Sequence, residues 1–146
     1  MATKNTEKNV EKVVVRGNSM KISFKFSVEA CNFIMGKKVD TAIKHLEMVL
    51  QKKMAMPITR FNANQAHRAG KMAAGKYPEK ISEAFINLLE TLKTNAEDQG
   101  LNSKELVITK AMANKGASRW KQRRLRGRQM KATKVEIEAM EAVKSK

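Results

Sequence analysis

Nine Lys and Arg side chains lie between Lys115 and Lys134, and no Asp or Glu interrupts them. The stretch is KGASRWKQRRLRGRQMKATK, with Arg dominant at its centre. A guanidinium group makes planar, bidentate hydrogen bonds to phosphate and stacks on bases, so these residues favour binding to a nucleic acid. Alternatively, a run of charged residues can be a solvated face or a disordered tail that binds no nucleic acid. Tails usually lie at chain ends, however, whereas this run lies between two predicted strands.

Trp120 is the only aromatic residue of the stretch. It could stack on an exposed base, as single-stranded or irregular RNA permits, or it could pack against its own hairpin. Gly116 and Gly127 would let the backbone bend or approach a ligand closely. We therefore predict RNA contacts from Lys115, Arg119, Trp120, Lys121, Arg123, Arg124, Arg126, Arg128 and Lys131.

A second set of basic residues lies outside this stretch. Each one alone is explained by a solvated surface, but together they suggest that phosphate contacts the chain on several sides. DNA-binding proteins usually concentrate their contacts on one element that enters a groove, so the distribution favours burial in folded RNA. The set comprises Arg16, Lys21 and Lys25 around the first predicted strand-to-helix turn, and Arg60, His67, Arg68, Lys71 and Lys76 in a long loop.

The sequence contains few residue patterns that are typical of enzymes. His45 and His67 lie far apart in the sequence, and a metal site needs more ligands at close spacing. The segment GKMAAGKY has two glycines near the spacing of a phosphate-binding loop, but Tyr77 stands where Ser or Thr is required and no strand precedes it. We expect no enzyme activity, no metal, no cofactor and no small-molecule substrate.

Composition limits the class of protein. The chain has 146 residues and a net charge of +16, and its apolar content of 42% suffices for a core, so we expect one domain with an anionic partner. The lone Cys31 excludes an internal disulfide and is interpreted as a small core residue. The sequence lacks the apolar run of a signal peptide and the roughly 18 apolar residues of a membrane span. We expect a soluble intracellular protein that does not enter a membrane.

Hydrophobic periodicity predicts the elements that position these cations. Residues 1–11 are predicted to form a flexible polar tail, and the β-branched run at 12–17 a strand. Apolar residues at helical spacing predict one helix from Phe24 to Gly36 and a second over Val39–Leu50. Residues 53–77 lack a sustained period and are predicted to be a long ordered loop with helical turns at most.

A third helix is predicted to open at Pro78, placed at the first helical position, and to stop at Gly100. Its apolar stripe is Ile81, Phe85, Leu88, Leu89, Leu92 and Ala96. Strands are predicted at 105–113 and at 131–140, where Val135, Ile137 and Ala139 alternate with charged residues. If these two strands pair antiparallel, the basic stretch is the tip of a β-hairpin that spans about 105–140.

The order of these segments resembles the universal large-subunit ribosomal protein twenty-two family in its archaeal and eukaryotic form. The resemblance covers roughly residues 13–139, and its motifs are specific in combination rather than singly. The matching segments are MKISFK (20–25), SVEACNFIMGKKVDTAIKHLEMVLQKK (27–53), RFNANQAHRAGK (60–71), GKYPEKISEAFINLLETLKTNAEDQGLN (75–102) and the frame KG…RGR (115–128).

The resemblance implies an α+β fold in one domain at 12–146, with about three helices packed on a small antiparallel sheet and one long, protruding basic hairpin. It also implies a cytoplasmic constituent of the large ribosomal subunit, with ribosomal RNA, neighbouring ribosomal proteins and the nascent polypeptide as partners. The hairpin tip would line the polypeptide exit tunnel through Arg119, Trp120, Lys121, Gln122, Arg123 and Arg124. The alternative is a basic nucleic-acid-binding protein outside the ribosome, such as a chromatin or RNA-chaperone module.

Overall fold

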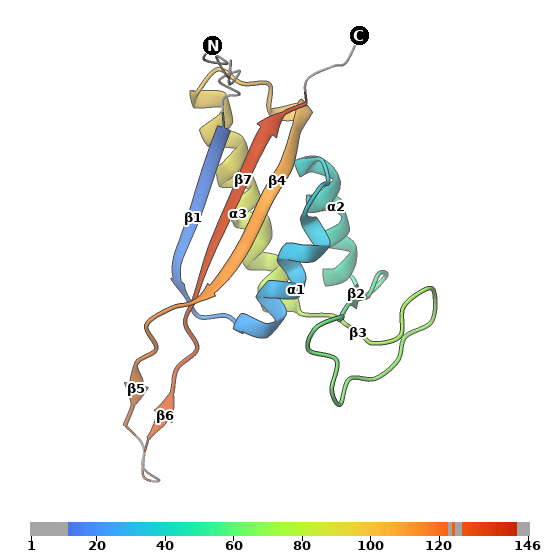
Figure 1. Ribbon diagram of the computed structural model, residues 1–146, viewed down its shortest axis with the longest axis vertical. Coiled ribbons are helices and arrows are strands. Elements are labelled where there is room, and N and C mark those ends of the chain that lie inside the picture. The colour runs from blue at the N-terminus through green and yellow to red at the C-terminus, as the bar shows by residue number, and fades with distance from the viewer. Residues whose placement is uncertain (1–11, 123, 125–126, 143–146) are drawn as a thin grey trace, which may run out of the picture.

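A three-stranded antiparallel sheet runs along the long axis of the molecule (Figure 1). β1 (Lys12–Met20) and β4 (Leu106–Lys115) both pair with β7 (Thr133–Glu141), which is the central strand. Val135, Ile137 and Ala139 of β7 are fully buried, as expected for a strand with one covered face. The computed structural model describes residues 12–122, 124 and 127–142, so the predicted tail at 1–11 lies outside the described residues.

Three helices cover one face of this sheet (Figure 1). α1 (Phe24–Ile34) packs on β4, α3 (Glu79–Asp98) packs on β1, and α2 (Val39–Leu50) packs on α3. Their apolar stripes and the covered face of the sheet form one buried core, so the predicted α+β class with three helices is confirmed. No helix in the described part of the chain is long and apolar enough to span a bilayer.

The link between α1 and α2 covers part of the free edge of β4. The backbone N–H of Gly36 donates to the carbonyl of Ile108 at 2.9 Å, and the N–H of Ile108 donates to the carbonyl of Lys37 at 3.0 Å. Gly36 has a φ of +77°, which glycine adopts without the steric cost of a Cβ. The predicted helix stop at Gly36 is therefore also the point where the helix pair joins the sheet.

Two predicted boundaries are wrong by small amounts. α3 begins at Glu79 rather than at Pro78, because the ψ of 77° at Pro78 is not helical although its carbonyl already accepts from Ile81 and Ser82. β1 extends to Met20, with a shift of register between Gly17 and Met20. The strands β4 and β7 lie close to their predicted ranges. A short 3-10 turn, η1 (Ser103–Glu105), precedes β4.

The loop at 53–77 contains two short strands, whereas an ordered loop with helical turns at most was predicted. β2 (Met56–Pro57) and β3 (Gly75–Lys76) form a short antiparallel pair, which closes the loop at its base. The N–H of Ile58 donates to the carbonyl of Ala74 at 2.9 Å and extends this closure. Two-residue strands are too short to produce a periodic sequence pattern, which is why the sequence does not predict them.

Beyond the end of the β4–β7 pair, the chain forms an arm, defined here as residues 116–132, that extends away from the helices (Figure 1). Within it, β5 (Trp120–Lys121) pairs with β6 (Arg128–Gln129). The predicted antiparallel pairing of the two flanking strands is thus observed, with Lys115 opposite Thr133 at the root of the arm. Arg123, Leu125 and Arg126 lie outside the described residues.

Candidate nucleic-acid interface

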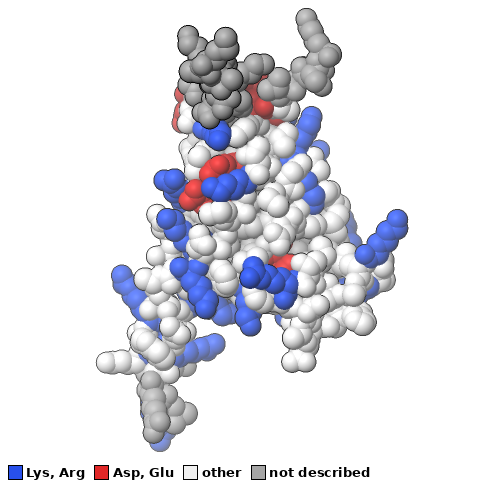
Figure 2. Space-filling model, viewed as in Figure 1, with Lys and Arg blue, Asp and Glu red and all other residues white. Residues whose placement is uncertain are grey.

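Three acid-free segments of the chain meet at the end of the molecule that carries the arm. They span residues 12–28, 51–78 and 111–134, and none contains Asp or Glu. Figure 2 shows that blue side chains are spread over this end and the arm, whereas the red ones on this face lie mostly toward the opposite end. Charge is therefore segregated along the molecule, which would produce a strong positive potential at one end.

Two of these segments join through a pair of aromatic rings. Phe24, the first residue of α1, and Phe61, in the loop after β2, meet edge to face with their centroids 6.5 Å apart. The Lys25 ammonium lies 5.6 Å from the centre of the Phe61 ring, and the Arg60 guanidinium lies 5.5 Å from it. A cation over an exposed ring is stabilised by about 0.5–1 kcal/mol. The rings thus favour positions close to Phe61 for these two cations before any ligand binds.

The same arrangement recurs at three further positions at this end of the molecule. Lys76 lies 4.9 Å from the ring centre of Phe26, Arg68 lies 5.2 Å from that of Tyr77, and Lys115 lies 5.9 Å from that of Phe24. Lys115 thereby connects the end of β4 to the start of α1. Long cationic side chains lose rotamer freedom when they bind, and partial ordering in advance reduces that cost.

A buried carboxylate beneath this surface holds the loop in position. Glu29 of α1 is only 2% exposed, and its carboxylate accepts hydrogen bonds from three consecutive backbone N–H groups: Thr59 at 3.1 Å, Arg60 at 2.7 Å and Phe61 at 3.2 Å. The Thr59 hydroxyl donates a fourth bond at 3.0 Å. Burial by itself would raise the pKa of Glu29, but these four bonds outweigh burial and hold the pKa below its ordinary value.

The rest of the loop presents its basic side chains to solvent. Arg68, His67 and Lys71 are exposed, although the backbone beneath them is ordered. The N–H of Arg68 donates to the carbonyl of Ala73 at 2.9 Å, and His67 forms an isolated bridge with Ala74. Gly75 is buried, and a Cβ there would lie 2.8 Å from Cγ of Arg68. The close approach at Gly75 thus fixes the direction in which Arg68 leaves the loop.

The arm is held by a few hydrogen bonds between its two sides. The N–H of Met130 donates to the carbonyl of Arg119 at 2.8 Å, and the side chain of Gln129 donates to the Ser118 hydroxyl at 2.6 Å. Trp120 is 69% exposed, although its ring lies next to the opposite side of the arm, where a Cβ at Gly127 would be 3.9 Å from its Cε3. Gln122 and Arg124 are exposed as well. Arg123 and Arg126, which the sequence also predicts to contact RNA, lie outside the described residues.

Arg16 is the predicted site residue that does not join this end. It lies on the uncovered face of the sheet, where its Nε is 3.3 Å from Oε2 of Glu136, its partner across the β1–β7 pair. Lys110 is likewise 2.8 Å from Glu138 on β7. Cross-strand ion pairs therefore neutralise the middle of the sheet, and the other predicted basic residues that the structure describes lie beyond it.

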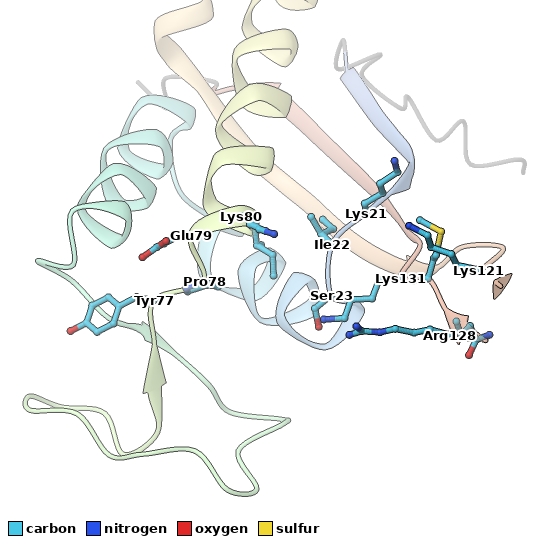
Figure 3. A pocket seen from close by; sticks show the side chains of 13 residues that line it. Lys21, Ile22, Ser23, Tyr77, Pro78, Glu79, Lys80, Lys121, Arg128 and Lys131 are labelled. Atoms are coloured by element: carbon cyan, nitrogen blue, oxygen red, sulfur yellow. The ribbon is translucent and has the colours of Figure 1, made fainter. Parts of the chain in front are cut away.

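Four predicted cations gather around one open groove at the root of the arm. Lys21 comes from the link between β1 and α1, and Lys121, Arg128 and Lys131 come from the arm (Figure 3). Lys80 of α3 also lines this groove, and sequence reasoning missed it because it stands between acids in the segment PEKISE. Sequence reasoning also missed Glu29 and the aromatic rings over which the cations lie. The alternation of aromatic and basic residues in FKF, RF and KY is the signal that could have identified these rings.

The remaining reactive side chains lie in the helices. Burial raises the pKa of the Cys31 thiol to about 12, which agrees with its predicted role as a core residue. His45 contacts the Phe33 ring, with centroids 6.0 Å apart, and burial together with the charge of Lys37 lowers its pKa. The described residues contain no group of three or more His, Cys, Asp or Glu that could hold a metal ion.

Comparisons with known proteins agree with this architecture. The sequence model of the family described as Ribosomal protein L22p/L17e matches residues 15–136. The chain is 45% identical to large ribosomal subunit protein uL22 of Archaeoglobus fulgidus over 102 residues, which are 68% of this chain and 66% of that protein. It is 41% identical to the uL22 protein of Methanoregula boonei over 104 residues, or 69% of this chain and 68% of that protein.

The matched region thus spans about two thirds of the length of these curated relatives. The uL22 protein of Thermoplasma volcanium is 42% identical over 95 residues, which are 65% of this chain and 64% of that protein. The family match covers most of the chain, from β1 to the middle of β7. The chain belongs to the ribosomal protein L22p/L17e family.

Proposed function

We propose that this protein is a structural constituent of the large ribosomal subunit, where it binds large-subunit ribosomal RNA through its cationic end. The observation that carries the proposal is the convergence of three acid-free segments of a member of this family on one end of the molecule. RNA phosphates would neutralise this end, and the ring-supported cations Lys25, Arg60 and Lys76 would contact them with little further ordering. The role is not enzymatic, and it places the protein in the cytoplasm with its ribosome.

We infer that the arm lines the polypeptide exit tunnel. The side chains that would face the lumen are Arg119, Trp120, Lys121, Gln122, Arg123 and Arg124. None of the arm residues that the structure describes is buried, and Trp120 is available to stack on a base. The arm would then contact ribosomal RNA along its length and the nascent polypeptide near its tip, while the opposite end of the fold would contact neighbouring ribosomal proteins.

Sedimentation tests the first part of this proposal. The tagged protein should co-migrate with the large subunit in a lysate of its own organism, and this association should survive a high-salt wash. A variant with Arg60→Glu, Arg68→Glu and Lys76→Glu should leave the subunit in the same wash. The matched control reverses Lys38, Lys44 and Lys104, which are exposed cations outside the three acid-free segments, and should remain bound. Association of the wild type with chromatin or with small RNAs alone would favour the alternative outside the ribosome.

Crosslinking tests the second part. A photo-crosslinking amino acid at Arg124 should capture nascent chains in stalled ribosomes, because the tip would face the lumen. The same group at Lys104, at the other end of β4, should capture none. Capture from Lys104 but not from Arg124 would place the other end of the protein in the tunnel.

A further inference from the structure

An open groove of about 720 Å³ lies between the root of the arm and the start of α3 (Figure 3). Five cations line it: Lys21 and Lys80 from the body, and Lys121, Arg128 and Lys131 from the arm. Its floor contains apolar side chains, among them Ile22 and Ile81. The volume falls within the range of pockets that bind ligands, about 300–1,000 Å³, and suits a short segment of one strand rather than a duplex.

The positive charge of this groove is not neutralised by its surroundings. Among the described residues, Glu79 is the only acid that lines it, and its carboxylate is 3.2 Å from the ammonium of Lys52. Figure 3 also shows Glu79 beside Tyr77 at one end, away from Lys21, Lys121 and Lys131. None of the five cations forms a salt bridge within the part of the chain that the structure describes.

The two walls of the groove meet at one buried contact. The hydroxyl of Thr133, at the start of β7, donates to the carbonyl of Ile22 at 3.0 Å, and Thr133 is opposite Met20 in the sheet. This contact joins the root of the arm to the segment that carries Lys21. Further out, the arm has its own short β5–β6 pair, and like charges on the two walls repel each other when the groove is empty.

We propose that this groove binds a single RNA strand whose phosphates bridge the arm to the body, so that RNA binding fixes the direction of the arm. The inference rests on the proposed function and names the site within it. Lys80 and Arg128 repel each other when the groove is empty, whereas RNA phosphates between the walls would attract both of them. The Thr133–Ile22 contact would serve as the pivot, and the bound strand would hold the two walls at one separation.

A double-mutant cycle across the groove tests the bridge. Lys80→Ala and Arg128→Ala should each weaken binding to a transcript of the organism's large-subunit ribosomal RNA. If the two residues act through one strand, the fold-loss in affinity of the double variant should be smaller than the product of the two single fold-losses. The difference should exceed about twofold, because independent sites already deviate from the product by that much. The matched control pairs Arg128→Ala with Lys104→Ala, whose effects should multiply. Multiplicative effects for Lys80 and Arg128 as well would overturn the bridge.

A distance measurement separates this proposal from RNA binding in general. Spin labels at Asn87→Cys on α3 and Gln122→Cys on the arm should give a broad distance distribution without RNA and a narrow one with the transcript. The native Cys31 is buried and should stay unlabelled. In Lys21→Ala/Lys80→Ala the transcript should still bind through the rest of the cationic end, but the distribution should stay broad. Binding with no narrowing in the wild type would refute the inference alone, whereas absence of binding would refute the proposed function.

Inorganic polyphosphate serves as the second probe in the same measurement. Narrowing with the transcript at lower concentration than with polyphosphate supports a site for an RNA strand. Narrowing with polyphosphate but not with the transcript would overturn the assignment to RNA.

Discussion

The backbone N–H of Arg60 donates a 2.7 Å hydrogen bond to Oε1 of Glu29, a carboxylate that the fold buries almost completely. A buried charge is costly unless hydrogen bonds satisfy it, and here N–H and O–H donors do so rather than a Lys or Arg. The cations of the loop therefore remain free of this acid and available at the surface. Glu29 determines where Arg60 and Phe61 lie without neutralising the face that they form.

Glu29→Gln should loosen the loop and destabilise the protein. An amide has one acceptor oxygen, and its NH2 group would face a backbone N–H that now binds the second carboxylate oxygen. Leaving such donors without partners costs about 1–3 kcal/mol, and we expect a loss of stability in that range. Chemical denaturation measures the loss, and amide exchange should become faster at Thr59, Arg60 and Phe61. Glu47→Gln, on the exposed side of α2, is the control and should change neither quantity.

Glu29 should also contribute to the pH dependence of stability. Its folded-state pKa lies below the ordinary value of 4.5, so its ionised form stabilises the fold above that value, and the contribution is lost as pH falls through the folded pKa. Unfolding measured from pH 7 to pH 2 should therefore show a smaller decrease in stability for Glu29→Gln than for the wild type. Parallel curves for the two proteins would show that the Glu29 pKa is not lowered by folding.

The sequence predicts the elements with long periodic patterns and misses those that depend on a few contacts. Helical stripes such as Ile81–Ala96 and the alternation at Val135–Ala139 predict α3 and β7, because burial of one face imposes the period. β2 and β3 have two residues each and no period to detect. Glu29 looks like an ordinary surface acid in the sequence, since only the tertiary approach of the loop supplies its donors.

The candidate site likewise contains residues that the sequence identifies and others that only the tertiary structure brings together. Runs of Lys and Arg identify the arm and the loop directly, because an uncompensated charge has no place in a core. The groove could not be predicted, since it brings Lys80 of α3 into one groove with arm residues that lie 41 to 51 positions later in the chain. Arg16 was predicted to contact RNA together with Lys21 because the two are close in the sequence. In the structure the end of β1 lies between them, and Arg16 forms an ion pair with Glu136 across the sheet.

Leu89→Asp should lower the stability of the fold, whereas Arg124→Ala should weaken RNA binding without a loss of stability. Leu89 is fully buried in α3, so a carboxylate there would lie in the core and cost more than about 4 kcal/mol. Leu88, its neighbour in the predicted stripe, is only partly buried against the core and is the weaker test. Arg124 is exposed, and its loss should leave the melting temperature unchanged while it weakens binding to ribosomal RNA. Equal losses of thermal stability would contradict the division between a folded body and an RNA-binding arm.

Removal of the arm should reduce the salt dependence of RNA binding as well as the affinity. The N–H of Gly116 donates to the carbonyl of Ala132 at 3.0 Å, so an Asn-Gly turn can replace residues 117–131 where the two sides already pair. The replacement deletes seven cations, namely Arg119, Lys121, Arg123, Arg124, Arg126, Arg128 and Lys131. For every phosphate that the shortened protein no longer neutralises, the slope of log K against log salt should flatten by about 0.7–0.9.

The shortened protein should still fold, because the deletion removes no residue of the buried core. It should still bind ribosomal RNA through Arg60, Arg68 and Lys76, with lower affinity and a shallower slope. Lys44→Gln/Lys104→Gln, which removes exposed cations elsewhere, is the control and should keep nearly the wild-type slope. Seven cations that neutralise phosphate cannot be deleted without a change in the number of counterions released. An unchanged slope in the shortened protein would therefore mean that the arm does not bind phosphate, whatever its effect on affinity.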